Sequence, residues 1–146
     1  PAQASPPLEG QGVSLDVWPD GRAPLTIRAE RFELDVDAGQ GEFSGAVEVV
    51  QRDVVLVCKA LTVRYDPDSG EVRELTARGG VEVRQGERIA RGQQARLLPD
   101  PPTIELTGDP EVLDGKVWLR GQVIRLQVET RILTCDGCEA VIGASR

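Results

Sequence analysis

The sequence of 146 residues contains no histidine and no methionine, and only 3% of its residues are aromatic. The absence of histidine excludes a Ser-His-Asp triad, a Cys-His catalytic pair and metal sites built on imidazole. No apolar run approaches the length of about 18 residues that a membrane-spanning helix needs. Because the chain opens on Pro1 and lacks methionine, we expect that a signal peptide, a membrane anchor or a tag has been removed upstream.

The 17 basic residues are dispersed and are outnumbered by 24 acidic ones. The formal net charge is -7, whereas binding to nucleic acid requires clustered lysine and arginine. Nucleic acid is therefore excluded as a partner. The chain is 40% hydrophobic and 28% charged, which is typical of a globular protein, and its length suits one domain.

Apolar residues alternate with polar ones from residue 24 onward, with the period of two that is typical of β-strands. Leu25, Ile27 and Ala29 begin the pattern, and short runs of the same kind recur to Val128. Turn-forming residues separate the runs. They lie at residues 37–39, 66–70, 85–87, 99–102, 114–115 and 136–137. The pattern predicts an all-β domain over 24–143 and a short tail at 144–146.

Residues 1–23 differ from the rest of the chain. The first twelve are rich in proline, glycine and serine and show no periodicity, so we expect a flexible extension. An alternating segment at 13–18 predicts an extra strand within this extension.

A short motif repeats along the chain at intervals of roughly 30 residues. Its copies begin at Gly45, Gly79 and Gly108, and a degraded copy begins at Cys138. Such repeats predict stacked β units that bury an apolar face against their neighbours.

Several motifs resemble a known family, the periplasmic lipopolysaccharide-transport bridge proteins called LptA or OstA. The resemblance lies in Pro24-Leu25-Thr26-Ile27 before Ala29, Phe43 to Val49 before Ala60, Gly92, Leu106 to Pro110, and Leu119-Arg120-Gly121. It implies an open V-shaped β-jellyroll of two stacked antiparallel sheets with an apolar interior channel. Lipopolysaccharide would hold its acyl chains, which belong to the lipid A part, in this channel and its sugars in water. The family implies no enzymatic activity and no cofactor.

The resemblance also implies which residues bind lipid. The residues on the inward alternation of the matched strands would line the channel, although each would equally be core in a closed sandwich. They are Ile27, Phe32, Leu34, Phe43, Val47, Val49, Leu56, Leu61, Val63, Val81, Val83, Ile104, Leu106, Leu119, Ile124 and Leu126.

An open jellyroll leaves unpaired strand edges that can accept a partner strand. We expect these edges at the first and last strands, unless the tails fold over them. Their residues are Leu25, Thr26, Ile27, Arg28 and Ala29, and Ala140, Val141 and Ile142. The family implies as partners an LptC-like inner-membrane protein and the jellyroll of an LptD-like outer-membrane translocon, or head-to-tail copies of the chain.

Some acidic residues and the cysteines are candidates for catalysis or thiol chemistry. Asp66 with Asp68 or Glu71 could serve as a carboxylate pair, but these residues lie in an obvious turn. Cys135 and Cys138 admit three interpretations: a redox pair, half of a zinc site, or a disulfide across a tight hairpin at Asp136-Gly137. The remaining cysteine, Cys58, alternates with Leu56 and is expected to be buried.

Three alternatives to the soluble bridge stay open at this stage. The chain could be a membrane-anchored LptC-like member or the N-terminal jellyroll of an LptD-like translocon. Outside the pathway, it could be a structural β-solenoid with a closed interior and no ligand, for which the repeat spacing is rather uneven.

Overall fold

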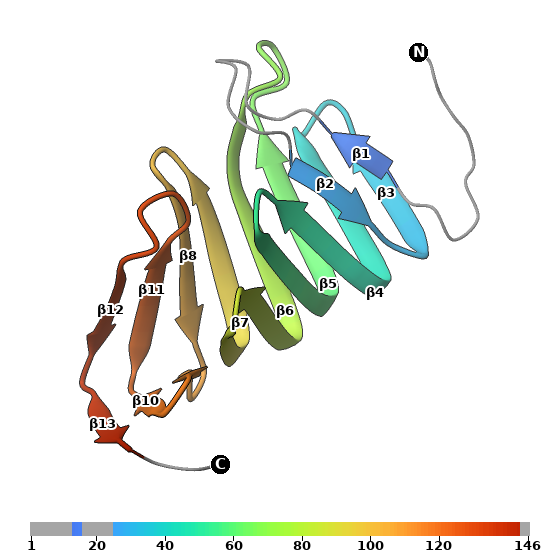
Figure 1. The fold of residues 1–146 in the computed structure, drawn as a ribbon. Coiled ribbons are helices and arrows are strands. Elements are labelled where there is room, and N and C mark those ends of the chain that lie inside the picture. The colour runs from blue at the N-terminus through green and yellow to red at the C-terminus, as the bar shows by residue number, and fades with distance from the viewer. Residues whose placement is uncertain (1–12, 16–24, 144–146) are drawn as a thin grey trace.

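The computed structural model describes residues 13–15 and 25–143, and all statements below concern these residues. The expectations of a flexible extension and of a strand continuing through 16–18 lie outside them. The described chain consists of strands joined by turns (Figure 1). The strands are β1 Val13–Leu15, β2 Leu25–Arg28, β3 Arg31–Asp35, β4 Gln40–Gln51, β5 Val54–Tyr65, β6 Val72–Gln85, β7 Arg88–Pro99, β8 Pro102–Thr107, β9 Glu111–Asp114, β10 Val117–Arg120, β11 Val123–Gln127, β12 Leu133–Asp136 and β13 Glu139–Ile142.

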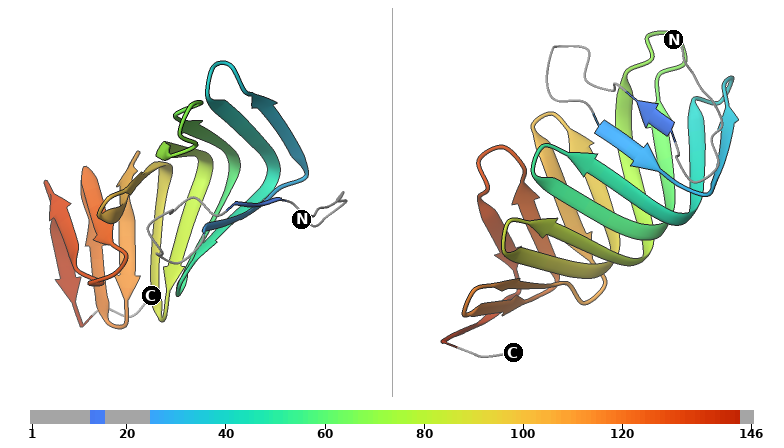
Figure 2. Two further views of the ribbon diagram at one scale, coloured as in Figure 1. Left: turned by 90° about the horizontal axis from the view of Figure 1, so that it is seen from above. Right: turned by 45° about the vertical axis from the view of Figure 1, so that its right-hand side comes forward.

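The strands pair antiparallel and form two half-sheets that share four long strands, β4 to β7. The first half-sheet runs from β3 across the long strands to β8, β11 and β12. The second runs from β1 and β2 across the same strands to β9, β10 and β13. Figures 1 and 2 show the strands following one another roughly in chain order, with β2 and β3 at one end and β12 and β13 at the other.

A corner separates the half-sheets, and the repeated glycine motif forms it. The register shifts between Ser44 and Val47 on β4, where Gly45 and Ala46 both have positive φ (82° and 47°). On β6 the equivalent shift contains Gly79 and Gly80, with φ of 87° and 67°. A Cβ on Gly79 would lie 2.8 Å from Cβ of Lys59, so this position requires glycine for both its backbone and its close neighbour.

The remaining motif copies lie at the same corner. Gly108 and Asp109, with φ of 78° and 53°, connect β8 to β9. The degraded copy follows Gly137, at the connection from β12 to β13. The repeat therefore marks where the chain passes from one half-sheet to the other.

The core lies between the half-sheets. Residues paired across antiparallel strands point to the same face, so the register defines continuous inward rows. In the first half-sheet one row is Phe32, Phe43, Leu61, Ala77, Ala95, Leu106, Ile124 and Cys135. In the second half-sheet the row is Ile27, Val49, Leu56, Val83, Ala90, Val112, Leu119 and Ala140. The prediction of an all-β, open antiparallel jellyroll with an apolar interior is confirmed.

Candidate functional site

The interior is apolar and, along its middle, filled by side chains of the chain itself. The residues predicted to line it are at most 3% exposed, except Phe32, Leu34 and Leu119. At such low exposure water does not reach them, so the two half-sheets contact each other there. A lipid chain in this space would have to separate the half-sheets.

Part of the interior was not expected from the sequence. Leu75, Ala77, Ala90, Ala95 and Leu97 are buried on β6 and β7. Leu75 alternates with Ala77 and Ala95 with Leu97, but the alanines are small and each pattern is only one pair long. The weak hydrophobic signal concealed this part of the core.

At the β3 end the interior opens to solvent. Phe32, Leu34 and Val36 are 39%, 49% and 59% exposed, and we call these three residues the mouth. Phe32 and Leu34 belong to the same inward rows as buried Phe43 and Val63. The mouth is therefore an accessible continuation of the buried apolar surface.

The strand edges differ from the expectation at the N-terminal end. β1 pairs with β2, aligning Val13 with Ile27 and Leu15 with Leu25. The edge expected at Leu25–Ala29 is therefore covered at Leu25, Thr26 and Ile27, which is the alternative in which the N-terminal tail folds over it. At the C-terminal end, the pairings within the described chain leave one side of β12 and one side of β13 free, and the predicted edge residues Ala140, Val141 and Ile142 lie on β13.

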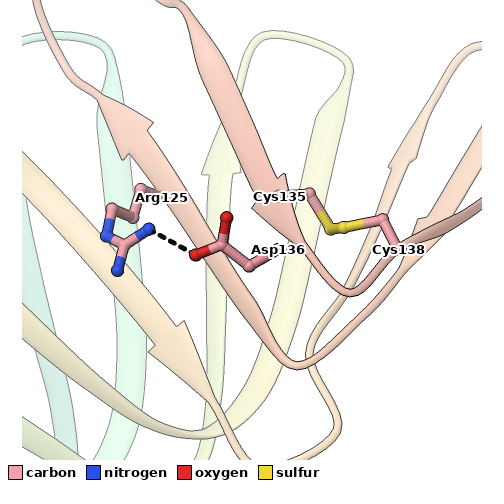
Figure 3. Close-up of a disulfide and its surroundings, with 4 residues drawn as sticks. All are labelled: Arg125, Cys135, Asp136 and Cys138. Atoms are coloured by element: carbon pink, nitrogen blue, oxygen red, sulfur yellow. Dashed lines mark hydrogen bonds and ion pairs between the residues drawn. A yellow bond between two sulfur atoms is a disulfide. The ribbon is translucent and has the colours of Figure 1, made fainter.

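A disulfide joins Cys135 to Cys138, whose Cα atoms are 5.9 Å apart (Figure 3). The expected hairpin at Asp136-Gly137 is wrong, because β12 pairs with β11 while β13 pairs with β10. The two cysteines lie at the corner, and a Cβ on Gly121 would lie within 2.8 Å of both sulfur atoms. The disulfide therefore ties the terminal strand of one half-sheet to that of the other.

The outer face of the first half-sheet carries a ladder of alternating charges. Arg96 bonds to Glu74 and lies 3.4 Å from Glu105, which also accepts a bond of 3.0 Å from Arg125. Arg125 in turn donates to Asp136 over 2.9 Å, next to the disulfide (Figure 3). The ladder crosses from β6 to β12. The half-sheet thus has a charged outer face and an apolar inner face.

On the second half-sheet the outer charges include Glu82, whose pKa is lowered mainly by a hydrogen bond from Arg84 and also by one from Arg91. These contacts stabilise the ionised carboxylate. They lie away from the interior, so they keep the outer face hydrated without adding charge to the core.

The candidate catalytic carboxylate Asp66 has structural partners. Asp66 accepts hydrogen bonds from the backbone N–H groups of Asp68 and Ser69 and from Arg73, and these bonds lower its pKa. It caps its own turn. Within 13–15 and 25–143, no three histidine, cysteine or acidic residues are grouped to hold a metal ion. The same residues include no helix long and apolar enough to cross a bilayer.

Comparison with known proteins supports this architecture. A crystal structure of LptH from Pseudomonas aeruginosa, titled the LptA-homologous periplasmic component of the lipopolysaccharide transport device, superposes with a TM-score of 0.71. It is 18% identical and the match covers 82% of this chain and 95% of LptH, so it supports the fold. A search of curated protein sequences gave no significant match. The family model described as "LptA/(LptD N-terminal domain) LPS transport protein" matches residues 26–132. Because this match spans most of the sequence, the chain belongs to the LptA/LptD N-terminal domain family of lipopolysaccharide-transport proteins.

Proposed function

We propose that the chain is a periplasmic lipid carrier that shields the acyl chains of lipopolysaccharide between its half-sheets. The observation that carries this proposal is the continuity of the inward rows. They run from the exposed mouth on β3 into a core whose buried residues are apolar except for Gln51, Thr62 and Gln85. A purely structural sandwich gains nothing from leaving Phe32 and Leu34 exposed at the end of such a row.

The energetics favour acyl chains as cargo. Removing one acyl chain of about a dozen methylenes from water is favourable by roughly 0.8 kcal/mol per methylene, or on the order of 10 kcal/mol per chain. The half-sheets lose contact with each other when they separate, but the inserted chains cover the same side chains. Much of the apolar surface therefore stays out of water in both states.

The charge distribution agrees with a carrier that holds lipid by its tails. The net charge is -7, and outward arginines such as Arg28 and Arg96 are paired with carboxylates. The surface as a whole does not attract the phosphates of lipid A. Binding would depend on burial of the tails, with the sugars in water.

Photolabelling tests this function directly. Lipid A carrying a diazirine on an acyl chain is incubated with the unmodified protein, irradiated, and the labelled peptides are mapped by mass spectrometry. We expect labels on inward residues such as Phe43 and Leu106. Labels confined to outward positions such as Arg28 and Glu48 would overturn the proposal.

We further propose that the chain bridges an LptC-like inner-membrane protein and an LptD-like outer-membrane jellyroll through its strand edges. β12 and β13 offer backbone donors and acceptors at the C-terminal end, and at the N-terminal end β3 pairs only with β4 among the described strands. Strand addition at these edges would continue both half-sheets into the next jellyroll. Copies of the chain could also stack head to tail in this way.

Scattering at increasing protein concentration tests edge pairing. Ile142 is 80% exposed on β13, and Ile142→Lys should reduce assembly because a lysine discourages pairing at an edge. Val57→Lys is the matched control, since Val57 is 39% exposed in the middle of the sheet. Wild-type protein that stays monomeric and binds neither partner jellyroll would contradict the bridging role.

A further inference from the structure

Residues 127–132 comprise the end of β11 and the loop that connects it to β12, and they reach from the first half-sheet to the turns of the second. Asp53 lies in the β4–β5 turn and accepts a hydrogen bond of 2.6 Å from Nη1 of Arg131. Arg52 in the same turn lies 3.6 Å from Glu129. The two half-sheets therefore contact each other at their outer turns as well as at the glycine corner.

The two residues that flank the β6–β7 turn, Gln85 and Arg88, add a second group of contacts to the loop. Nε2 of Gln85 donates to Oδ1 of Asp53 (3.1 Å) and to the backbone carbonyl of Val128 (3.2 Å). Nη1 of Arg88 donates 3.0 Å to the carbonyl of Arg131. Gln85 is only 2% exposed, so this part of the contact is sheltered from water and its hydrogen bonds are strengthened.

The loop itself is built to hold this position. Val128 is 4% exposed and its N–H donates to the carbonyl of Pro102, which anchors the loop to its own half-sheet. Arg131 has a φ of 64°, a left-handed conformation that an arginine rarely adopts. The backbone N–H of Arg131 donates to Gln127, and its side chain and carbonyl both bond to the opposite half-sheet. These contacts offset the unfavourable conformation.

We propose that residues 127–132 form a latch that holds the half-sheets closed on the side opposite the corner, and that lipid enters when the latch releases. The middle of the interior is filled, so entry requires the half-sheets to separate, and the glycine corner is the natural hinge. The exposed ion pairs are individually weak. A modest cost of opening suits a carrier that must both take up and release its cargo. The part of this proposal that concerns lipid entry rests on the proposed carrier function. The part that concerns closure of the half-sheets does not.

Two variants open the latch without altering the core. Asp53→Asn keeps an oxygen that can accept from Gln85 but removes the charge opposite Arg131. Arg131→Asn removes the guanidinium, and asparagine tolerates a left-handed backbone. Glu48→Gln is the matched control, because it breaks an exposed ion pair of 3.2 Å with Arg28 that lies within one half-sheet. Thermal melting followed by circular dichroism confirms that each variant is folded.

Hydrogen exchange without lipid is the first measurement. Both latch variants should exchange faster than wild type in peptides covering 85–88 and 127–132, by roughly two- to fivefold, the range expected when one partly exposed ion pair is lost. High salt should accelerate exchange in the wild type and have less effect on the variants. Unchanged exchange in both variants would overturn the latch.

The rate at which diazirine lipid A labels interior residues is the second measurement. Both latch variants should load faster than wild type by a similar factor, while Glu48→Gln should load at the wild-type rate. Faster exchange with unchanged loading would overturn the role in lipid entry. If neither the wild type nor any variant takes up lipid although hydrogen exchange accelerates in the latch variants, the latch between the half-sheets is supported and the proposed carrier function fails.

Discussion

Phe32 and Phe43 face each other across β3 and β4 with their ring centroids 4.5 Å apart, yet Phe43 is 1% exposed and Phe32 is 39% exposed. The boundary between core and solvent thus passes between two tilted rings in contact on the same face of the sheet. An apolar surface that crosses this boundary is suited to receive a hydrophobic ligand from outside.

The mouth and the buried core should therefore respond differently to truncation. Leu61→Ala removes a fully buried side chain and should lower the free energy of unfolding by about 2–5 kcal/mol. Leu34→Ala removes a side chain that is 49% exposed and should cost about 0.5 kcal/mol or less. It should nevertheless slow labelling by diazirine lipid A, because the first apolar contact is lost. Urea unfolding and photolabelling measure the two effects.

Val57→Ala is the control for the mouth, since Val57 is a partly exposed apolar residue outside the inward rows. Its truncation should leave lipid labelling unchanged. Equal labelling rates for Leu34→Ala and Val57→Ala would show that lipid does not use the mouth.

The disulfide should contribute stability by restricting the unfolded chain. Closing the four-residue loop from Cys135 to Cys138 corresponds to about 2 kcal/mol in the chain-entropy model. The double variant Cys135→Ser, Cys138→Ser should lose up to this amount in urea unfolding. Adding a reductant should destabilise the wild type to a similar extent and leave the double variant unaffected. A variant as stable as the wild type would show that the disulfide does not restrict the chain in this way.

Much of the fold follows from the sequence because strand alternation is a local property. Phe43, Val47 and Val49 alternate on one strand, and the structure places all three in the core. Ala77 on β6 and Ala95 on β7 share that core but were harder to predict, because they contribute little hydrophobicity of their own. Their burial depends on the neighbouring strands.

The latch and the arrangement of the disulfide could not be predicted from local patterns. Asp53 and Arg131 are distant in the sequence, and nothing near either residue indicates that they meet. Asp136-Gly137 has the composition of a hairpin turn, but its flanking strands find better partners in β11 and β10. The repeated glycine motif was visible in the sequence, whereas its role as the corner required the strand register.

The corner glycines should be intolerant of a side chain. Gly79→Ala places a Cβ 2.8 Å from Cβ of Lys59 at a φ of 87°, and we expect a loss of about 2–3 kcal/mol in urea unfolding. Gly70→Ala is the matched control, with a φ of 79° and no atom within 4 Å of the added Cβ. It should lose only about 1 kcal/mol. Equal losses would show that close packing at the corner is unimportant.

The thiol of Cys58 offers a probe of the folded state. Burial raises its pKa despite hydrogen bonds to the backbone of Arg78 and Ala60, which act in the opposite direction. The thiolate is the nucleophile, so Cys58 in the folded protein should react with Ellman's reagent at pH 8 at least about tenfold more slowly than an exposed thiol.

The raised pKa of Cys58 also means that ionisation of its thiol opposes folding. The unfolded thiol loses its proton at lower pH than the folded one, so stability from this group falls as the pH rises above the unfolded pKa.

Denaturation in concentrated urea should release one reactive thiol per chain, because Cys58 is free while the other two cysteines are joined in the disulfide. Cys58→Ala should release none. If one thiol of the folded protein reacted at the rate of an exposed thiol, this would contradict the burial of Cys58. Three thiols on unfolding without reductant would contradict the disulfide. The same titration on the latch variants is informative, because Cys58 shares the interior with Val47 and any faster reaction there reports movement of the half-sheets.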